Sequence, residues 1–127
     1  MAHFAKYARG SCASITQHDE RKKNEKGEYL KFKNQQIDSN RTYLNYNLGP
    51  KREISQLEFI KQRTEDLHCL KRKDVNVLGS WVVTAPKELP AEQIEDFFNR
   101  SYAFLENKYG RANVVSSFVH LDELQPH

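Results

Sequence analysis

Two histidines and two carboxylates lie within eight residues at the end of the sequence. His120 and His127 bracket Asp122 and Glu123, directly after an apolar run at 114–119. Imidazole nitrogens suit transition metals and carboxylate oxygens suit harder cations, so this segment could hold Mn²⁺, Zn²⁺ or Mg²⁺. The alternative is a polar hairpin whose histidines bind nothing.

The geometry of this candidate metal site depends on the backbone that carries it. In a strand, alternate side chains share a face, so His120 and Asp122 would point one way and Glu123 the other. A turn at 124–126, where a proline favours a bend, would bring His127 back near His120. We therefore expect a divalent-metal site with nitrogen ligands and nearby carboxylates.

The chain has 127 residues, which fits one domain. No apolar run is long enough for a signal peptide or for a membrane span of roughly 20 residues, so we expect a soluble, cytoplasmic protein with no membrane segment. Cys12 and Cys69 are too few and too far apart for a disulfide framework, and we expect both to be reduced.

Charge is distributed unevenly along the chain. Residues 1–73 hold 16 Lys and Arg against 9 Asp and Glu, whereas residues 74–127 hold 4 against 8. A basic N-terminal part suits a polyanion such as DNA, and an acidic C-terminal part suits a cation. A solvated surface without a partner is the plainer interpretation.

Hydrophobic periodicity predicts the elements that must position these residues. The sequence predicts strands at 3–8, 42–48, 75–84 and 113–120, helices at 11–21, 53–66 and 90–110, and a mobile loop at 22–36. Their order, without the glycine loops of parallel units, indicates an α+β fold with a mostly antiparallel central sheet and flanking helices.

Three segments contain short sequence motifs that occur in a fixed order along the chain. Residues 18–21 resemble an HxxR element, residues 37–48 resemble IDxSRTxLNYxL, and residues 104–127 resemble FLxxxYGxxNV…VHxDExxPHxH. Together they are similar to the Mob/Pre family of plasmid mobilisation relaxases, also called plasmid recombination enzymes, within the HUH nucleases. The resemblance spans residues 18 to 127 and implies an HUH relaxase-like fold.

The resemblance implies a metal-dependent nuclease that nicks one DNA strand at a plasmid's origin of transfer and becomes covalently joined to its 5′ end. The family's N-terminal histidine is implicated as the nucleophile, and the matching residue is His18. A neutral imidazole has a lone pair available near pH 7. Arg21 would share its helix face and hold phosphate oxygens. The implied ligands of the metal, with Mn²⁺ favoured over Mg²⁺ and Zn²⁺, are His120, His127, Glu123 and Asp122.

The implied partner is the origin DNA of a supercoiled plasmid, as a single strand or a hairpin. Tyr46 could instead be a rival nucleophile, a stacking surface or a core residue, and Tyr109 could lie in the core. A solvated basic turn is the alternative for 71–73. The residues expected to contact DNA are Arg41, Tyr46, Lys71, Arg72, Lys73 and Tyr109.

The family pattern continues with a further histidine two positions beyond His127. We therefore expect residues 1–127 to be the N-terminal part of a single relaxase domain, one metal ligand short, in a protein that oligomerises through a later C-terminal region. Two other functions stay open. One is a non-catalytic DNA-binding fragment, and the other is an HUH-type replication initiator, whose nucleophilic tyrosine would follow the metal motif.

Overall fold

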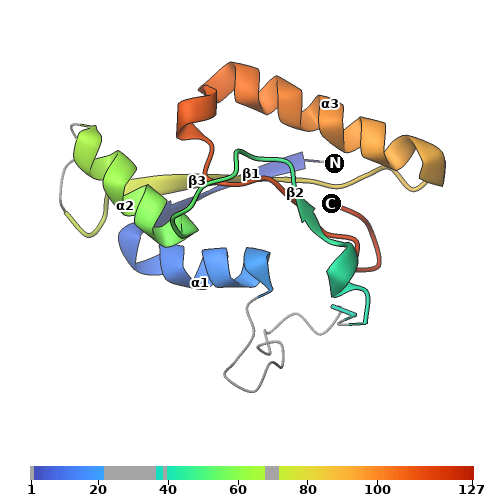
Figure 1. Ribbon diagram of the computed structural model, residues 1–127, viewed down its shortest axis with the longest axis horizontal. Helices are drawn as coiled ribbons and strands as arrows, with labels where there is room; N and C mark the ends of the chain where they lie inside the picture. Colours follow the sequence, from blue (N-terminus) through green and yellow to red (C-terminus); the bar gives the residue numbers. More distant parts are fainter. Residues whose placement is uncertain (1, 22–36, 39, 68–71) are drawn as a thin grey trace.

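An antiparallel pair of strands lies at the centre of the computed structural model, which describes residues 2–21, 37–38, 40–67 and 72–127 (Figure 1). In this pair, β1 (Ala2–Ala8) runs against β3 (Asn76–Val83), so the strands expected at 3–8 and 75–84 are confirmed. Phe4 lies opposite Trp81, with ring centroids 5.1 Å apart.

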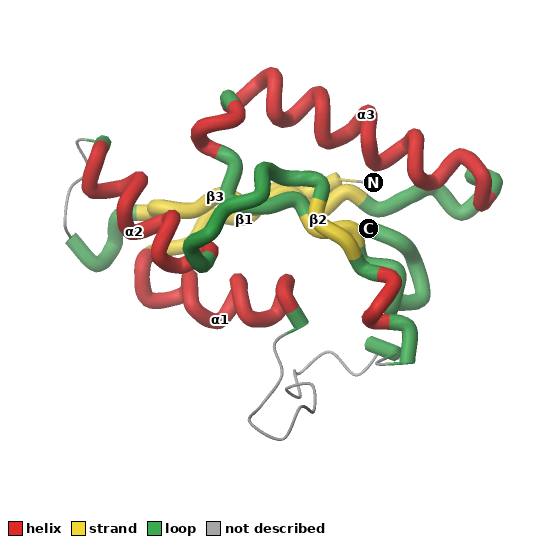
Figure 2. The backbone as a smooth tube through the Cα atoms, in the orientation of Figure 1, coloured by secondary structure: helices red, strands yellow, loops and turns green. Residues whose placement is uncertain are grey.

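Helices cover both faces of this central pair. Both α1 (Arg9–Glu20) and α2 (Gln56–Asp66) lie on one face, while α3 (Ala91–Tyr109) crosses the other face (Figure 2). The three helices expected from the sequence are thus confirmed, although α2 begins three residues later than its pattern suggested. The loop expected at 22–36 lies outside the described residues.

Local sequence explains where the helices begin and end. The Ser55 hydroxyl accepts a hydrogen bond from the Glu58 amide at 3.1 Å and caps the start of α2. Pro90 precedes α3, and Gly110 ends it with a φ of 89°, a conformation that glycine adopts without strain. Arg21 ends α1 with a φ of 52°.

A second antiparallel pair joins the middle of the chain to its end. In this pair, β2 (Tyr46–Asn47) runs against β4 (Phe118–Val119). The main buried cluster links this pair to α3 and is formed by Ala85, Phe98 and Val119, with Tyr46, Leu48, Leu89, Ile94, Phe97 and Leu121 packed against it. The expected α+β class with antiparallel strands and flanking helices is confirmed, with its strands divided between two sheets.

The strands expected at 42–48 and 113–120 are much shorter than their sequences suggested. Residues 42–44 and 111–113 form 3₁₀ turns instead. The Asn47 side chain accepts hydrogen bonds from the amides of Gly49 and Ser117, both at 2.9 Å, and so replaces the backbone bonds of a longer ladder. In the described part of the chain, no helix is long and apolar enough to cross a membrane.

Candidate functional site

The last residues of the chain form a tight hairpin that brings two histidines together. The His120 amide donates to the His127 carbonyl at 2.7 Å, and the His127 amide donates to the His120 carbonyl at 3.3 Å. The ring atoms His120 Nδ1 and His127 Nε2 are 3.3 Å apart. The expected turn that returns His127 to His120 is confirmed.

Backbone carbonyls determine which ring nitrogens carry protons. His120 Nε2 lies 3.0 Å from the carbonyl oxygen of Asp19, and His127 Nδ1 lies 3.2 Å from that of Gln125. A carbonyl oxygen can only accept, so each of these nitrogens bears the hydrogen of its neutral ring. The two nitrogens that face each other at 3.3 Å, His120 Nδ1 and His127 Nε2, therefore both present lone pairs.

Two facing lone pairs can both bind one cation. Burial, followed by the charges of Arg21 and His127, lowers the pKa of His120 to about 4, which disfavours a shared proton near neutral pH. Two nitrogens bound to one tetrahedral ion at about 2.05 Å each lie about 3.3 Å apart. The donor chemistry and the observed spacing thus fit a transition metal, which His120 and His127 would hold.

Carboxylates contribute less to this pair than the sequence suggested. Glu123 Oε2 is 3.8 Å from His127 Nε2, so Glu123 stays a candidate ligand. Among the described residues, no group of three or more His, Cys, Asp and Glu side chains is arranged to hold a metal ion.

Asp122 is engaged in a buried ion pair rather than at the histidines. It is 1% exposed, and its carboxylate accepts from Arg21 Nε at 2.9 Å, from Arg21 Nη2 at 3.1 Å and from the Thr42 hydroxyl at 2.8 Å. Burial alone would raise the pKa of Asp122, but these hydrogen bonds lower it to about 2. The oxygens of Asp122 thus serve the arginine, and the metal-ligand role expected for Asp122 stays a prediction.

Arg21 also differs from its expected role. It lies beyond the last turn of α1 in a left-handed conformation, so it does not continue the helix face that carries His18. The guanidinium is 3% exposed and binds Asp122, Glu123 Oε1 at 3.0 Å and the His18 carbonyl at 2.7 Å. A guanidinium so enclosed fixes the protein backbone, and its expected contact with phosphate oxygens stays a prediction.

His18 lies half-buried in the last turn of α1. Burial, followed by the positive charge of Arg21, lowers its pKa, while Glu123 acts in the opposite direction. The end of α1 touches the hairpin, since the carbonyl of Asp19 meets His120. The structure thus brings the turn that holds His18 to the histidine pair, and the imidazole is neutral near pH 7.

Three residues of the site were not identified from the sequence. The Asn45 side chain accepts from the Leu121 amide at 2.7 Å, and the Asp38 amide donates to the Asp122 carbonyl at 2.6 Å. With Thr42, they tie residues 38–45 to the hairpin. All three belong to the segment that resembles the IDxSRTxLNYxL motif, and that resemblance was the signal that could have found them.

The expected DNA contacts are dispersed over the molecule. Arg41 is exposed beside the Thr42 turn, whereas Tyr46 is half-buried against the main cluster. Arg72 pairs loosely with Asp74 at 3.6 Å, and Lys73 beside it is exposed. Both residues precede β3, at the end of that strand that lies away from the hairpin (Figure 1). Tyr109 accepts from Trp81 Nε1 at 3.1 Å, and Lys71 lies outside the described residues.

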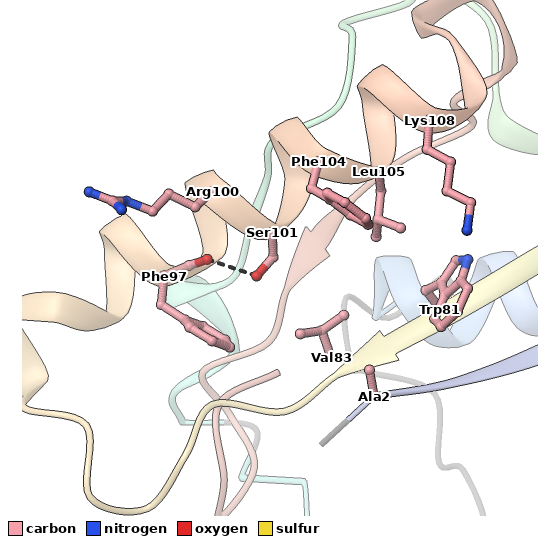
Figure 3. A pocket seen from close by; sticks show the side chains of 9 residues that line it. All are labelled: Ala2, Trp81, Val83, Phe97, Arg100, Ser101, Phe104, Leu105 and Lys108. Atoms are coloured by element: carbon pink, nitrogen blue, oxygen red, sulfur yellow. Dashed lines mark hydrogen bonds between the residues drawn. The ribbon is translucent and has the colours of Figure 1, made fainter.

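A separate cavity of about 430 Å³ opens between α3 and the central strands (Figure 3). Its walls are mainly apolar, with Trp81 and Val83 on β3 facing Phe97 and Phe104 on α3, and with Lys108 above the Trp81 ring. The residues that line it include no histidine or carboxylate, so the cavity is chemically distinct from the histidine pair.

The sequence model of the plasmid recombination enzyme family matches residues 1–127. A type 1 plasmid recombination enzyme of Staphylococcus aureus is 36% identical over 103 residues, which cover 76% of this chain and 26% of that protein. A plasmid recombination enzyme of Bacillus thuringiensis is 29% identical over 132 residues, covering 100% of this chain and 28% of that protein. The chain thus spans about a quarter of these relatives.

Solved structures agree with the sequence matches. The MobM relaxase domain, Mn-bound and in complex with oriT DNA of plasmid pMV158, superposes with a TM-score of 0.81 at 28% identity. The match covers 100% of this chain and 66% of that domain. A second structure of the same domain with oriT DNA gives 0.78 at 29% identity. By sequence and by fold, the chain belongs to the plasmid recombination enzyme family.

Proposed function

We propose that this chain is the N-terminal part of a relaxase domain that nicks one strand of plasmid DNA at an origin of transfer, for mobilisation or recombination. The observation that carries the proposal is the approach of His120 Nδ1 and His127 Nε2 to 3.3 Å, beside the turn of α1 that holds His18. The MobM relaxase domain, a relative of similar fold, contains manganese and origin DNA.

His18 is the proposed nucleophile. One nitrogen of its neutral imidazole attacks the scissile phosphorus, a phosphorus–nitrogen bond forms, the bond to the 3′ oxygen breaks, and that oxygen takes up a proton. The product is a protein joined to the 5′ phosphate and a free 3′ hydroxyl end. The lowered pKa of His18 keeps the attacking lone pair available at neutral pH.

His120 and His127 would hold the divalent metal, with Glu123 as the closest carboxylate and Mn²⁺ as the favoured ion. When bound, such an ion polarises the phosphoryl oxygens and stabilises the charge that develops on them. The buried carboxylate of Asp122 serves this arrangement indirectly, because it holds Arg21, which in turn holds the His18 carbonyl.

Tyr46 is a weaker candidate for the nucleophile. Its ring packs against the buried cluster of β4 and α3, and burial together with the charge of Glu95 raises the pKa of its hydroxyl. A phenol of raised pKa is protonated near pH 7 and attacks phosphorus poorly. Its position supports a packing role.

The test is to trap the covalent adduct. The chain, His18→Ala and Tyr46→Phe are incubated with Mn²⁺ and an origin-of-transfer oligonucleotide from the plasmid that encodes the protein, and the adducts are then treated with acid. We expect any adduct of the unmodified chain and of Tyr46→Phe to be acid-labile, and none to form in His18→Ala. An acid-stable adduct lost only in Tyr46→Phe would refute the assignment. Tight DNA binding without any Mn²⁺-dependent nicking would favour a non-catalytic DNA-binding fragment.

A further inference from the structure

A threonine in the middle of the chain is linked to His18 through two buried charged residues. We propose that Thr42 is a positioning residue that sets the orientation of His18 by way of Asp122 and Arg21. The inference rests on the proposed function of His18, but its structural part can be tested without it. Nothing in the reaction requires Thr42 to touch DNA or metal.

The link consists of three consecutive hydrogen bonds. The Thr42 hydroxyl donates to Asp122 Oδ2 at 2.8 Å. Arg21 Nε donates to the same oxygen at 2.9 Å, and Arg21 Nη1 donates to the His18 carbonyl at 2.7 Å. The four residues come from three segments far apart in the sequence, so the link joins the 38–45 segment, the hairpin and the end of α1.

Burial makes each bond of this link difficult to replace. Asp122 is 1% exposed, Arg21 is 3% exposed and Thr42 is 8% exposed. Water does not reach the ion pair easily, so an Asp122 oxygen deprived of the threonine hydroxyl keeps one donor, the Arg21 Nε, in place of two. The carboxylate then shifts to recover a donor, and the guanidinium bound to it shifts as well.

Such a shift would reach His18 through its own backbone. Arg21 closes α1 in a left-handed conformation while its side chain folds back onto the His18 carbonyl. Movement of the guanidinium therefore changes the last turn of the helix, from which the imidazole projects. A nucleophile must lie in line with the bond that breaks, and a displacement of about 1 Å can lower the rate about a hundredfold.

The remaining contacts of the segment allow Thr42 to be changed without releasing the hairpin. The Asp38 amide still donates to the Asp122 carbonyl, and Asn45 still accepts from the Leu121 amide. Valine has nearly the shape of threonine and carries a methyl group in place of the hydroxyl. Thr42→Val therefore removes one hydrogen bond while the packing is retained, and Thr42→Ser keeps the hydroxyl while a buried methyl group is lost.

The experiment compares these two variants with Thr64→Val. Thr64 lies in α2 and donates only to carbonyls of its own helix, Ile60 at 2.9 Å and Lys61 at 3.0 Å, so it is a matched control. For each protein we would measure melting temperature, Mn²⁺ affinity, affinity for the origin oligonucleotide, and the rate of adduct formation at saturating oligonucleotide. The His18 ring signals in ¹⁵N-edited NMR spectra report on its orientation without any reaction.

We expect Thr42→Val to slow adduct formation at least about tenfold at saturating DNA, while affinity for the oligonucleotide stays within about threefold. His18 signals should shift or broaden in Thr42→Val but not in Thr64→Val. Thr42→Ser should melt at a lower temperature than the unmodified chain and yet react at its rate, which a merely structural role would not produce.

Two outcomes separate this inference from the proposed function. If the unmodified chain forms no adduct but the His18 signals respond to Thr42→Val alone, nuclease activity of this chain is refuted and the positioning link stands. If the chain reacts, and Thr42→Val has unchanged His18 signals and an unchanged rate, Thr42 is not a positioning residue and the inference is wrong.

Discussion

The backbone carbonyl of Asp19 accepts a hydrogen bond from one ring of the histidine pair, while burial destabilises the ionised form of its side-chain carboxylate. Its carbonyl accepts from His120 Nε2 at 3.0 Å and so fixes the tautomer of that ring. Burial raises the pKa of its carboxyl group to about 6, and the charge of Arg21 offsets this only in part. The ionised carboxylate is thus destabilised in the folded protein near neutral pH.

Asp19→Asn should stabilise the metal-free protein, and more at pH 8 than at pH 5. The folded-state pKa of about 6 lies above the ordinary value of 3.8, so the proton contributes stability that is complete below 3.8 and is lost as pH rises through 6. Asparagine does not titrate. The gap in unfolding free energy should therefore widen by about 1 kcal/mol between pH 5 and pH 8.

Denaturant unfolding in a chelator at both pH values measures this gap. Asp96→Asn is the control, because that carboxylate is exposed and forms only a surface pair with Arg100 at 2.8 Å. Its effect should be small and similar at both pH values. A gap for Asp19→Asn that is equal at pH 5 and pH 8 would contradict the account of its buried charge.

Among the elements, α3 was the most predictable. Its apolar residues recur at helical spacing, Pro90 precedes its first turn and Gly110 follows its last, and the helix runs over Ala91–Tyr109 as expected. The 42–48 segment was not predictable to the same degree. Its aromatic and β-branched residues indicated a strand, but side-chain hydrogen bonds of Thr42 and Asn47 compete with the ladder.

The histidine pair was predictable because its two residues are close in sequence. The ion pair of Arg21 with Asp122 was not. His120 and His127 are separated by seven positions around a proline, so a simple turn joins them. Arg21 and Asp122 are 101 positions apart, and periodicity carries no information about such a contact. The sequence predicted that Arg21 would hold phosphate oxygens and that Asp122 would bind the metal, because nothing local indicates that the two residues pair with each other.

Gly110→Ala should destabilise the protein by about 1 kcal/mol, because its φ of 89° lies where a side chain is strained. Gly10 is the matched control. It lies in the first turn of α1, and a Cβ built there meets no atom within 4 Å. Gly10→Ala should therefore leave stability unchanged or raise it by up to about 1 kcal/mol. Thermal unfolding distinguishes the two, and equal effects would contradict the capping role of Gly110.

At the scale of the whole molecule, the excess of positive charge and the candidate metal ligands occupy different parts of the chain. Lys and Arg exceed Asp and Glu in residues 1–73, and the reverse holds in residues 74–127. Phosphate attraction depends on the number of cations at the interface and not on a bound metal. We therefore propose that DNA affinity and metal affinity are separable properties of this chain.

The salt dependence of DNA binding tests that separation. In a chelator, His120→Ala should bind single-stranded DNA with the affinity and salt dependence of the unmodified chain. Arg41→Gln should reduce the slope of log affinity against log salt by about 0.7, the value of one phosphate contact on single strands. Arg41 is exposed beside the turn at Thr42 that reaches the hairpin, whereas Arg100 is exposed on α3 and is already paired with Asp96 at 2.8 Å. Arg100→Gln is therefore the matched control and should leave the slope unchanged.

A slope that falls for Arg100→Gln but not for Arg41→Gln would place the DNA path over α3. A loss of binding in His120→Ala would mean that the metal site itself holds the DNA.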